Sequence, residues 1–147
     1  MAEGTEGSIE IAALPAEIME VITDFDAYPK WAQGVKKAKV LKKDSKGRPS
    51  EVSMEAGQMG INAAYTLAYT YKAKDGGLSW TTKEASGAVK DIQGEYALEP
   101  AGEQTKVTYR LTMVPAISLG SFMKRQAERT IINTALGGLK KRVESGR

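Results

Sequence analysis

The sequence predicts an α+β domain in which an antiparallel sheet of seven strands wraps around one long C-terminal helix. Three observations predict this fold. Apolar residues alternate with polar ones over residues 35–114, interrupted by short polar or glycine-rich turns. The period then changes to three and four over 119–143. Two short helical segments, opened by Pro15 and Pro29, separate the first strand from the other six.

The N-terminal part is expected to contain one strand and the two short helices. Residues 8–12 alternate in polarity and predict the first strand. Pro15 suits a first helical turn, and apolar residues at helical spacing predict a helix over 16–23. Pro29 opens the second helix, and Gly34 ends it. The chain is expected to form one domain over 1–147, with frayed ends at 1–7 and 144–147.

Turn residues divide the central part of the chain into strands. The Asp75-Gly76-Gly77 sequence is typical of a hairpin. Gly94, inside a strand, indicates a bulge or the close approach of another element. The alternation of apolar and polar residues in this part of the chain is typical of antiparallel strands with one buried face and one solvent-exposed face. Six strands are expected here, at 35–43, 51–56, 61–73, 78–84, 88–99 and 104–114.

The last segment, 119–143, is expected to form one amphipathic helix of about 25 residues and roughly 37 Å. It is the only predicted helix long enough to cover the apolar face of the sheet. The adjacent glycines Gly137 and Gly138 allow a kink or the close approach of another backbone. The wet side of the helix is expected to carry Lys124, Arg125, Glu128, Arg129, Lys140 and Lys141.

Two residue types are missing, and their absence excludes several kinds of chemistry. The 147 residues include no cysteine and no histidine. The chain therefore has no disulfide, no thiolate nucleophile, no Ser-His-Asp triad and no histidine metal site. No metal and no organic cofactor is indicated, so the cofactor expectation is none.

The charge pattern leaves two interpretations open. The net charge is +3, and basic residues are concentrated in the Lys36–Lys43 region and at 140–142. This region could attract an anionic surface or an acidic protein, or it could be a solvated face. Aromatic residues do not alternate with the lysines, so no specific nucleic acid partner is expected. The chain shows neither a signal sequence nor a membrane-spanning run, which predicts a soluble, cytoplasmic protein.

A curved sheet that holds one long helix tends to leave an apolar cavity between them. Tyrosines and Trp80 would give its wall both apolar area and hydrogen-bond donors, and methionines would make it adaptable. The alternative is that these residues only pack the core. The residues expected to line the cavity are Met54, Tyr65, Leu67, Tyr69, Trp80, Ile92, Tyr96, Tyr109, Met113, Met123, Ala127 and Ile131.

No catalytic residue is assigned, and Glu84 is the one weak candidate. It shares strand parity with Leu78 and Trp80, so its carboxyl could lie on the inner face and act as an acid or base. It also lies near a turn, where exposure is the alternative. Asp24 and Asp26 are expected to serve in capping or turns. A bulge would exchange the inward and outward residues of any strand.

Several stretches of the sequence resemble one superfamily. They are Pro15, the stretch from Asp24 to Trp31, the strand end Gly94–Pro100, the strand 105–111 and the terminal helix. Together they resemble the START-like superfamily, also called SRPBCC, the fold of the birch-pollen allergen. Within it, the chain is most similar to the bacterial polyketide cyclase/dehydrase and lipid-transport family. The resemblance covers about residues 8–143.

The resemblance implies a helix-grip fold with an internal hydrophobic cavity. Members bind lipids, sterols, quinones or polyketides, and some act as aromatases, cyclases or dehydratases. Enzymes of the cyclase type place polar or ionisable groups, often Arg, Tyr, Ser or His, in the cavity. This chain departs from that pattern because it has no histidine and no local motif of a cyclase pair.

Three functions are open at this point. The first is a carrier or sensor that binds a hydrophobic or amphiphilic small molecule in the cavity, as a monomer or weak dimer. The second is an enzyme of the polyketide cyclase, aromatase or dehydratase type that uses cavity tyrosines and a carboxylate such as Glu84. The third is an interaction module that docks through the Lys36–Lys43 region.

Overall fold

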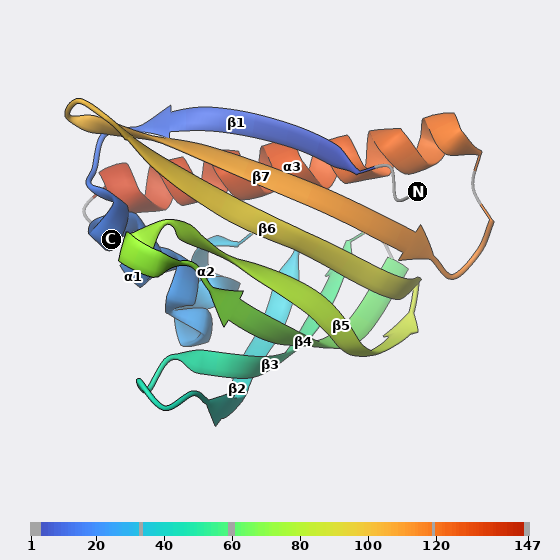
Figure 1. The fold of residues 1–147 in the computed structure, drawn as a ribbon. Coiled ribbons are helices and arrows are strands. Elements are labelled where there is room, and N and C mark those ends of the chain that lie inside the picture. Colours follow the sequence, from blue (N-terminus) through green and yellow to red (C-terminus); the bar gives the residue numbers. More distant parts are fainter. Residues whose placement is uncertain (1–3, 33, 59–60, 119, 146–147) are drawn as a thin grey trace.

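The computed structural model describes residues 4–32, 34–58, 61–118 and 120–145. Its centre is a curved antiparallel sheet with the strand order β1-β7-β6-β5-β4-β3-β2, which confirms the predicted architecture (Figure 1). The helix α3 (Ser121–Glu144) runs along one side of the sheet. The strands are β1 (Thr5–Ile11), β2 (Val35–Lys43), β3 (Pro49–Gln58), β4 (Ile61–Tyr71), β5 (Gly77–Gly87), β6 (Val89–Ala101) and β7 (Gln104–Pro115).

The short helices follow β1 and close one end of the sheet. They are α1 (Pro15–Thr23), the 3-10 turn η1 (Phe25–Ala27) and α2 (Tyr28–Trp31), and a second 3-10 turn, η2 (Ala73–Asp75), joins β4 to β5. The α1 helix buries Ile18, Val21 and Ile22, the residues whose spacing predicted it.

Two chain ends differ from the expectation of fraying. Strand β1 begins at Thr5, which is buried and pairs with Leu111 of β7. At the other end, the carboxylate of Glu144 accepts a hydrogen bond from the Ala12 amide at 2.9 Å. These long-range contacts order both segments, whereas the local sequence contains no sign of them. Residues 1–3, 146 and 147 lie outside the described residues, as does Leu119, where the last helix was expected to begin.

Helix α3 lies mainly against β1 and β7, at one edge of the sheet. This close packing requires a glycine in β1, because a Cβ atom at Gly7 would lie only 2.8 Å from Cγ2 of Ile132. Further along, Gly138 faces α2, where its Cβ would lie 3.3 Å from the carbonyl oxygen of Trp31. The expected close approach of another backbone therefore occurs at Gly138, within one continuous helix.

The opposite edge of the sheet is β2, the lysine-rich strand. Its lysines are exposed, and Lys42 pairs with Glu51 at 3.6 Å. Lysines on an edge strand discourage edge-to-edge pairing with another sheet, which fits the solvated interpretation. The inner side of β2 faces η1 and α2 rather than α3. The two edges of the sheet are thus covered by different elements.

Candidate ligand-binding site

The inner face of the sheet carries a cluster of aromatic rings. Tyr69 of β4 pairs across the strands with Trp80 of β5, and Tyr96 of β6 pairs with Tyr109 of β7. The Trp80 ring lies 5.9 Å from Tyr69, 5.9 Å from Tyr96 and 5.4 Å from Tyr109, between ring centroids. Trp80 can lie flat on β6 because its partner there is Gly94, whose Cβ would meet the indole at 2.6 Å. The glycine thus marks a close approach, as one of the two predictions for it stated.

The short helices extend this cluster with three more rings. The Phe25 centroid lies 5.0 Å from that of Tyr69 and 4.8 Å from that of Tyr28. Tyr28 in turn lies 5.0 Å from Trp31. A continuous aromatic row therefore runs from α2 through η1 to β7. From the sequence, these three residues only indicated a family resemblance and were not expected at the site, because their neighbours there come from strands far along the chain.

Most polar atoms of this row have no hydrogen-bond partner. Tyr28 donates from its hydroxyl to the carbonyl oxygen of Ile22. In the part of the chain that the structure describes, Trp80 Nε1 and Trp31 Nε1 are buried without a partner. Four tyrosine hydroxyls make no hydrogen bond among the described residues, although they are not among the fully buried unpaired atoms: Tyr65, Tyr69, Tyr96 and Tyr109. Unpaired donors in an apolar interior are costly unless a water or ligand satisfies them.

Burial also sets the protonation state of these phenols. It raises the pKa of Tyr69, Tyr96 and Tyr109 well above the ordinary 10.0, since the charged form would lose its hydration. Neighbouring tyrosines add to the rise for Tyr69 and Tyr109. The hydroxyls are therefore neutral near pH 7, so they can donate or accept a hydrogen bond but do not supply a phenolate base.

The twelve predicted lining residues fall into three groups. Seven are buried: Met54, Leu67, Trp80, Ile92, Tyr96, Tyr109 and Met113. Four are half-buried: Tyr65, Tyr69, Ala127 and Ile131. The exception is Met123, which is 57% exposed in the first turns of α3 and does not lie in the interior. It is one of several exposed apolar residues at the end of β7, in the connection and at the start of α3, which also include Val114, Ile117 and Phe122.

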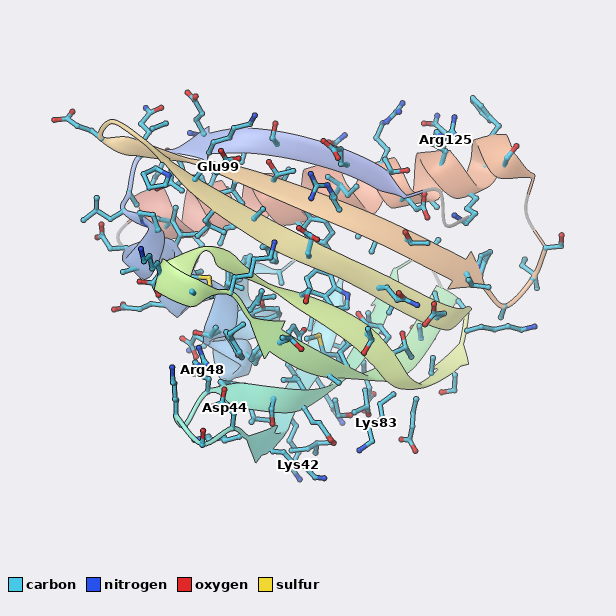
Figure 2. All side chains as sticks on the ribbon, in the orientation of Figure 1. Lys42, Asp44, Arg48, Lys83, Glu99 and Arg125 are labelled. Carbon is cyan, nitrogen blue, oxygen red and sulfur yellow. The ribbon has the colours of Figure 1, made fainter. Side chains whose placement is uncertain are left out.

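Glu84 lies on the outer face, because a bulge changes the parity of β5. Thr82 pairs with Leu67 on the inner face, yet Glu84 pairs with Thr66, the very next residue of β4. Lys83 is thus the extra residue, and Figure 2 shows its side chain on the outside of the sheet. Its Nζ lies 2.8 Å from the Glu51 carboxylate. The exposed Glu84 is therefore unsuitable as an interior acid or base, and the parity argument for it was wrong.

Glu128 is buried, although the helical spacing predicted that it lies on the solvent-exposed side of the last helix. It is 1% exposed, and its carboxylate accepts hydrogen bonds from Thr5 Oγ1, the Met113 amide and Lys124 Nζ at 2.7, 2.8 and 2.8 Å. Burial acts to raise the pKa of Glu128, but these three donors lower it below the ordinary 4.5. Glu128 thereby ties α3 to β1 and β7. Only its Lys124 partner, four residues away on the helix, was visible in the sequence.

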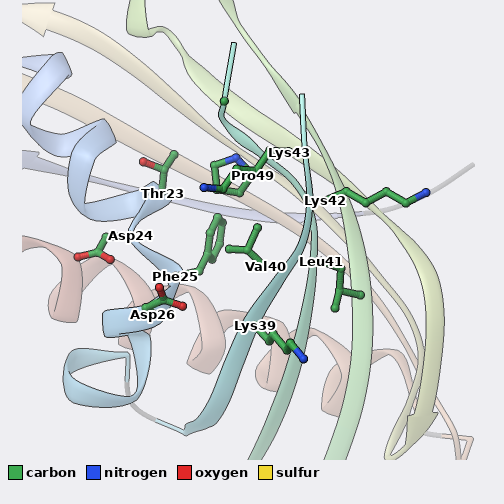
Figure 3. Close-up of a pocket in the computed structure, with 11 residues that line it drawn as sticks. Thr23, Asp24, Phe25, Asp26, Lys39, Val40, Leu41, Lys42, Lys43 and Pro49 are labelled. Carbon is green, nitrogen blue, oxygen red and sulfur yellow. The ribbon is translucent and has the colours of Figure 1, made fainter. Parts of the chain in front are cut away.

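Two clefts formed by described residues lie beside Thr23, and of the rings in the aromatic row only Phe25 lines one of them. The larger, here called the η1–β2 cleft, has a volume of about 650 Å³. Figure 3 shows Phe25 and Val40 facing each other in it, with Leu41 and Lys42 directed away. A second cleft of about 310 Å³ lies between α1, Arg48 and Tyr71. The η1–β2 cleft is lined by Thr23, Asp24, Phe25, Asp26, Lys39, Val40, Leu41, Lys42, Lys43, Gly47 and Pro49.

Neither cleft contains any of the twelve predicted lining residues. Asp24 lies in the turn between α1 and η1, one of the two roles expected for it, and its side chain makes no cap hydrogen bond. Over the described residues, no group of three or more acidic side chains is placed to hold a metal ion. Within the same residues, no helix has the length and apolar content needed to span a membrane.

Comparison with known structures shows the fold. A START superfamily protein from Mycobacterium smegmatis is 20% identical with a TM-score of 0.90, over 98% of this chain and 99% of that one. The Zhui aromatase/cyclase from Streptomyces sp. R1128 is 14% identical with a TM-score of 0.73, over 98% and 94%. A STAR-related lipid transfer protein from Xanthomonas axonopodis is 19% identical with a TM-score of 0.72, over 96% and 85%.

Comparison with curated protein sequences finds no significant match. The profile of the family described as polyketide cyclase / dehydrase and lipid transport matches residues 4–144, nearly the whole chain. This match and the START fold confirm the resemblance inferred from the sequence. The chain therefore belongs to the polyketide cyclase / dehydrase and lipid transport family.

Proposed function

We propose that this chain binds an amphiphilic small molecule between α3 and the inner face of the sheet, as a carrier or sensor. The ligand has an apolar chain or ring system and at least one hydrogen-bonding oxygen. Lipids, quinones, polyketides and sterol-like compounds have this chemistry. The single domain 1–147, acting in the cytoplasm as a monomer or weak dimer, forms part of the same proposal.

The observation that carries the proposal is the set of unpaired donors in the aromatic row. Trp80 is 6% exposed, and its indole N–H has no partner in the described part of the chain. The rings of Tyr96 and Tyr109 adjoin the Trp80 ring, and their neutral hydroxyls also have no partner among the described residues. A core that served only for packing would pair these groups or replace them with phenylalanine. A ligand oxygen would satisfy them, while the rings would cover its apolar part.

Partial exposure of inward residues supports the same proposal. Tyr65 and Tyr69 point to the inner face through their pairing with Met54 and Trp80, yet both are only half-buried. Ile131 of α3 packs against the core and is also half-buried. Because α3 lies mainly against β1 and β7, the inner surface of β4 is less completely covered. The proposed site consists of the eleven predicted lining residues other than Met123.

Native mass spectrometry of the purified protein, followed by organic extraction, is the first test. A retained compound that is hydrophobic and contains oxygen would support the proposal and name the ligand class. The binding of cis-parinaric acid, a fluorescent fatty acid, provides the second measurement. A protein that is purified empty and does not bind this probe or a panel of quinones and polyketides would contradict the proposal.

Two tyrosine variants separate ligand binding from structural support. The double variant Tyr96→Phe/Tyr109→Phe removes two hydroxyls that have no protein partner. It should weaken binding of a ligand with oxygen atoms by about tenfold and leave stability within about 0.5 kcal/mol. The matched control is Tyr71→Phe, which removes a hydrogen bond to the Pro49 carbonyl oxygen at 2.7 Å. This control should cost about 1 kcal/mol of stability and leave affinity unchanged.

The family description and the likeness to an aromatase/cyclase favour a second candidate, an enzyme that folds a polyketide chain. The neutral tyrosine hydroxyls would then donate hydrogen bonds to substrate carbonyl groups. Incubation with a poly-β-ketone analogue distinguishes the candidates. An enzyme would lose far more turnover than affinity in the Tyr96→Phe/Tyr109→Phe variant, whereas a carrier would show no turnover in either form. Docking through the Lys36–Lys43 region stays a separate prediction, and high salt should abolish it.

A further inference from the structure

Phe25 adjoins both the η1–β2 cleft and the aromatic rings of the sheet. Its side chain lines the cleft, and its residue is 1% exposed. Its ring also lies 5.0 Å from the ring of Tyr69, which adjoins Trp80 in the proposed binding site. One aromatic side chain thus lies between an open cleft of about 650 Å³ and the interior.

The wall that carries Phe25 is held by few interactions. The η1 turn has three residues and no side-chain cap hydrogen bond. Asp24 and Asp26 lie on its side of the cleft, and Lys39 and Lys43 lie on the β2 side. No ion pair joins these opposite charges across the cleft, within the part of the chain described by the structure. Strand β2 is an edge strand with irregular pairing to β3, so this wall is also less regular.

The other end of the interior is held more firmly. There, Glu128 joins Thr5, Met113 and Lys124 through three hydrogen bonds to a buried carboxylate. Opening the interior at the N-terminal half of α3 would break this network and expose the charge. Opening it at η1 would move a short turn and one ring. Local opening occurs where few buried contacts are lost.

We propose that the η1–β2 cleft is the entrance to the binding site and that Phe25 is its gate. This inference rests on the function proposed above. The ligand enters with its apolar part first, since Phe25, Val40 and Pro49 form an apolar surface inside a charged rim. The displaced Phe25 ring then lets it reach Tyr69 and Trp80. Such gating limits both association and dissociation rates while leaving the equilibrium affinity unchanged.

A reversible cross-link tests the entrance directly. The chain has no cysteine, so the double variant Asp26→Cys/Lys39→Cys introduces two thiols at exposed positions on opposite sides of the cleft. A bis-maleimide with a central disulfide joins them, and a phosphine reductant cleaves the link. The matched control is Ile117→Cys/Phe122→Cys, at exposed positions of the β7–α3 connection. Stopped-flow fluorescence with cis-parinaric acid gives both rate constants.

The cross-linked cleft should slow association and dissociation at least tenfold, and cleavage should restore both rates. The control cross-link should change neither. Unchanged rates in the cross-linked cleft, with probe binding intact, would overturn the entrance. Slowing only in the control would overturn it as well and move the entrance to the β7–α3 end. If the protein without a cross-link binds neither cis-parinaric acid nor the quinones and polyketides of the panel, the proposed function is overturned, and this inference with it.

The gate itself is tested by Phe25→Leu, which keeps an apolar side chain but removes the ring. Both rate constants should rise at least threefold, with the equilibrium constant changed less than twofold. The matched control is Phe122→Leu, because Phe122 is 73% exposed at the other end. Equal rates in Phe25→Leu and the unmodified protein, with both proteins folded by circular dichroism, would contradict the gate.

Discussion

The two edges of the sheet are closed by different means. At the β1 edge, α3 sits directly on the strand because Gly7 leaves room for Ile132, and Glu128 fastens the helix to β1 and β7. At the β2 edge, η1 faces the strand across an open cleft. The first edge combines close packing with a buried charge network, whereas the second has the buried Phe25 ring beside an open cleft and, among the described residues, no ion pair across that cleft. The difference teaches that one structure can hold its long helix rigidly and still provide a route to the interior.

The strongest test of the firm edge is Glu128→Ala. It removes the acceptor of three hydrogen bonds and leaves the buried Thr5 hydroxyl and Met113 amide unpaired. We expect a loss of about 3 kcal/mol in the free energy of unfolding, measured by urea titration. The exposed neighbour Arg129→Ala is the control, expected to change stability by less than about 0.5 kcal/mol. Equal effects of the two variants would show that the network does not fasten the edge.

The same network predicts a dependence of stability on pH. Since the pKa of Glu128 is lowered on folding, its ionised form favours the folded state, fully so above its ordinary value of 4.5. This contribution is lost as the pH falls through the lowered pKa. The difference in unfolding free energy between the unmodified protein and Glu128→Gln should therefore be constant near pH 7 and shrink below pH 4.5. A difference that grows as the pH falls would contradict the lowered pKa.

Native-state hydrogen exchange measures the contrast between the two edges. Amides of α3 near Ile132 should exchange at least tenfold more slowly than those of β2 near Val40, because local opening at η1 breaks fewer buried contacts. Glu128→Ala should reduce the protection of the N-terminal half of α3 and leave β2 unchanged. Equal protection at both edges in the unmodified protein would remove the physical basis of the contrast.

A smaller loss is expected from Gly7→Ala. The new Cβ would lie 2.8 Å from Cγ2 of Ile132, a methyl group that branches directly from the helix residue and has little freedom to move. We expect a loss of about 1–2 kcal/mol in thermal or urea unfolding. Combining it with Ile132→Leu, which removes that methyl group, should give less than the sum of the two single losses. Strict additivity would show that the contact is not the cause.

The smallest effect concerns two adjacent glycines of α3. A Cβ atom at Gly137 would have no atom within 4 Å apart from its chain neighbours and the nearby backbone of α3. Gly137→Ala should therefore stabilise the helix by about 0.5–1 kcal/mol. At Gly138 the Cβ would lie 3.3 Å from the Trp31 carbonyl oxygen, so its replacement by alanine should stabilise less. Thermal denaturation distinguishes them. Equal stabilisation by the two variants would show that α2 can shift away from α3 at no cost in stability.

The sequence was sufficient for the elements and for most of the interior. Alternation predicted the strands, and seven of the predicted lining residues are buried. It failed at Glu84, where the extra residue Lys83 reverses the parity of the strand end. It failed at Met123 as well, because helical spacing does not reveal that the first turns of α3 are left exposed. Bulges and element ends depend on a partner strand that the local sequence does not contain.

Local patterns by themselves determined the α+β class, the strand and helix order, the family resemblance and the absence of histidine and cysteine chemistry. Only the tertiary structure decided which side chains meet. Thr5 meets Glu128, 123 residues away, and Phe25 of η1 meets Tyr69 of β4. The physical reason is that periodicity reports which face of an element is apolar, whereas contacts between elements depend on how the chain folds back on itself.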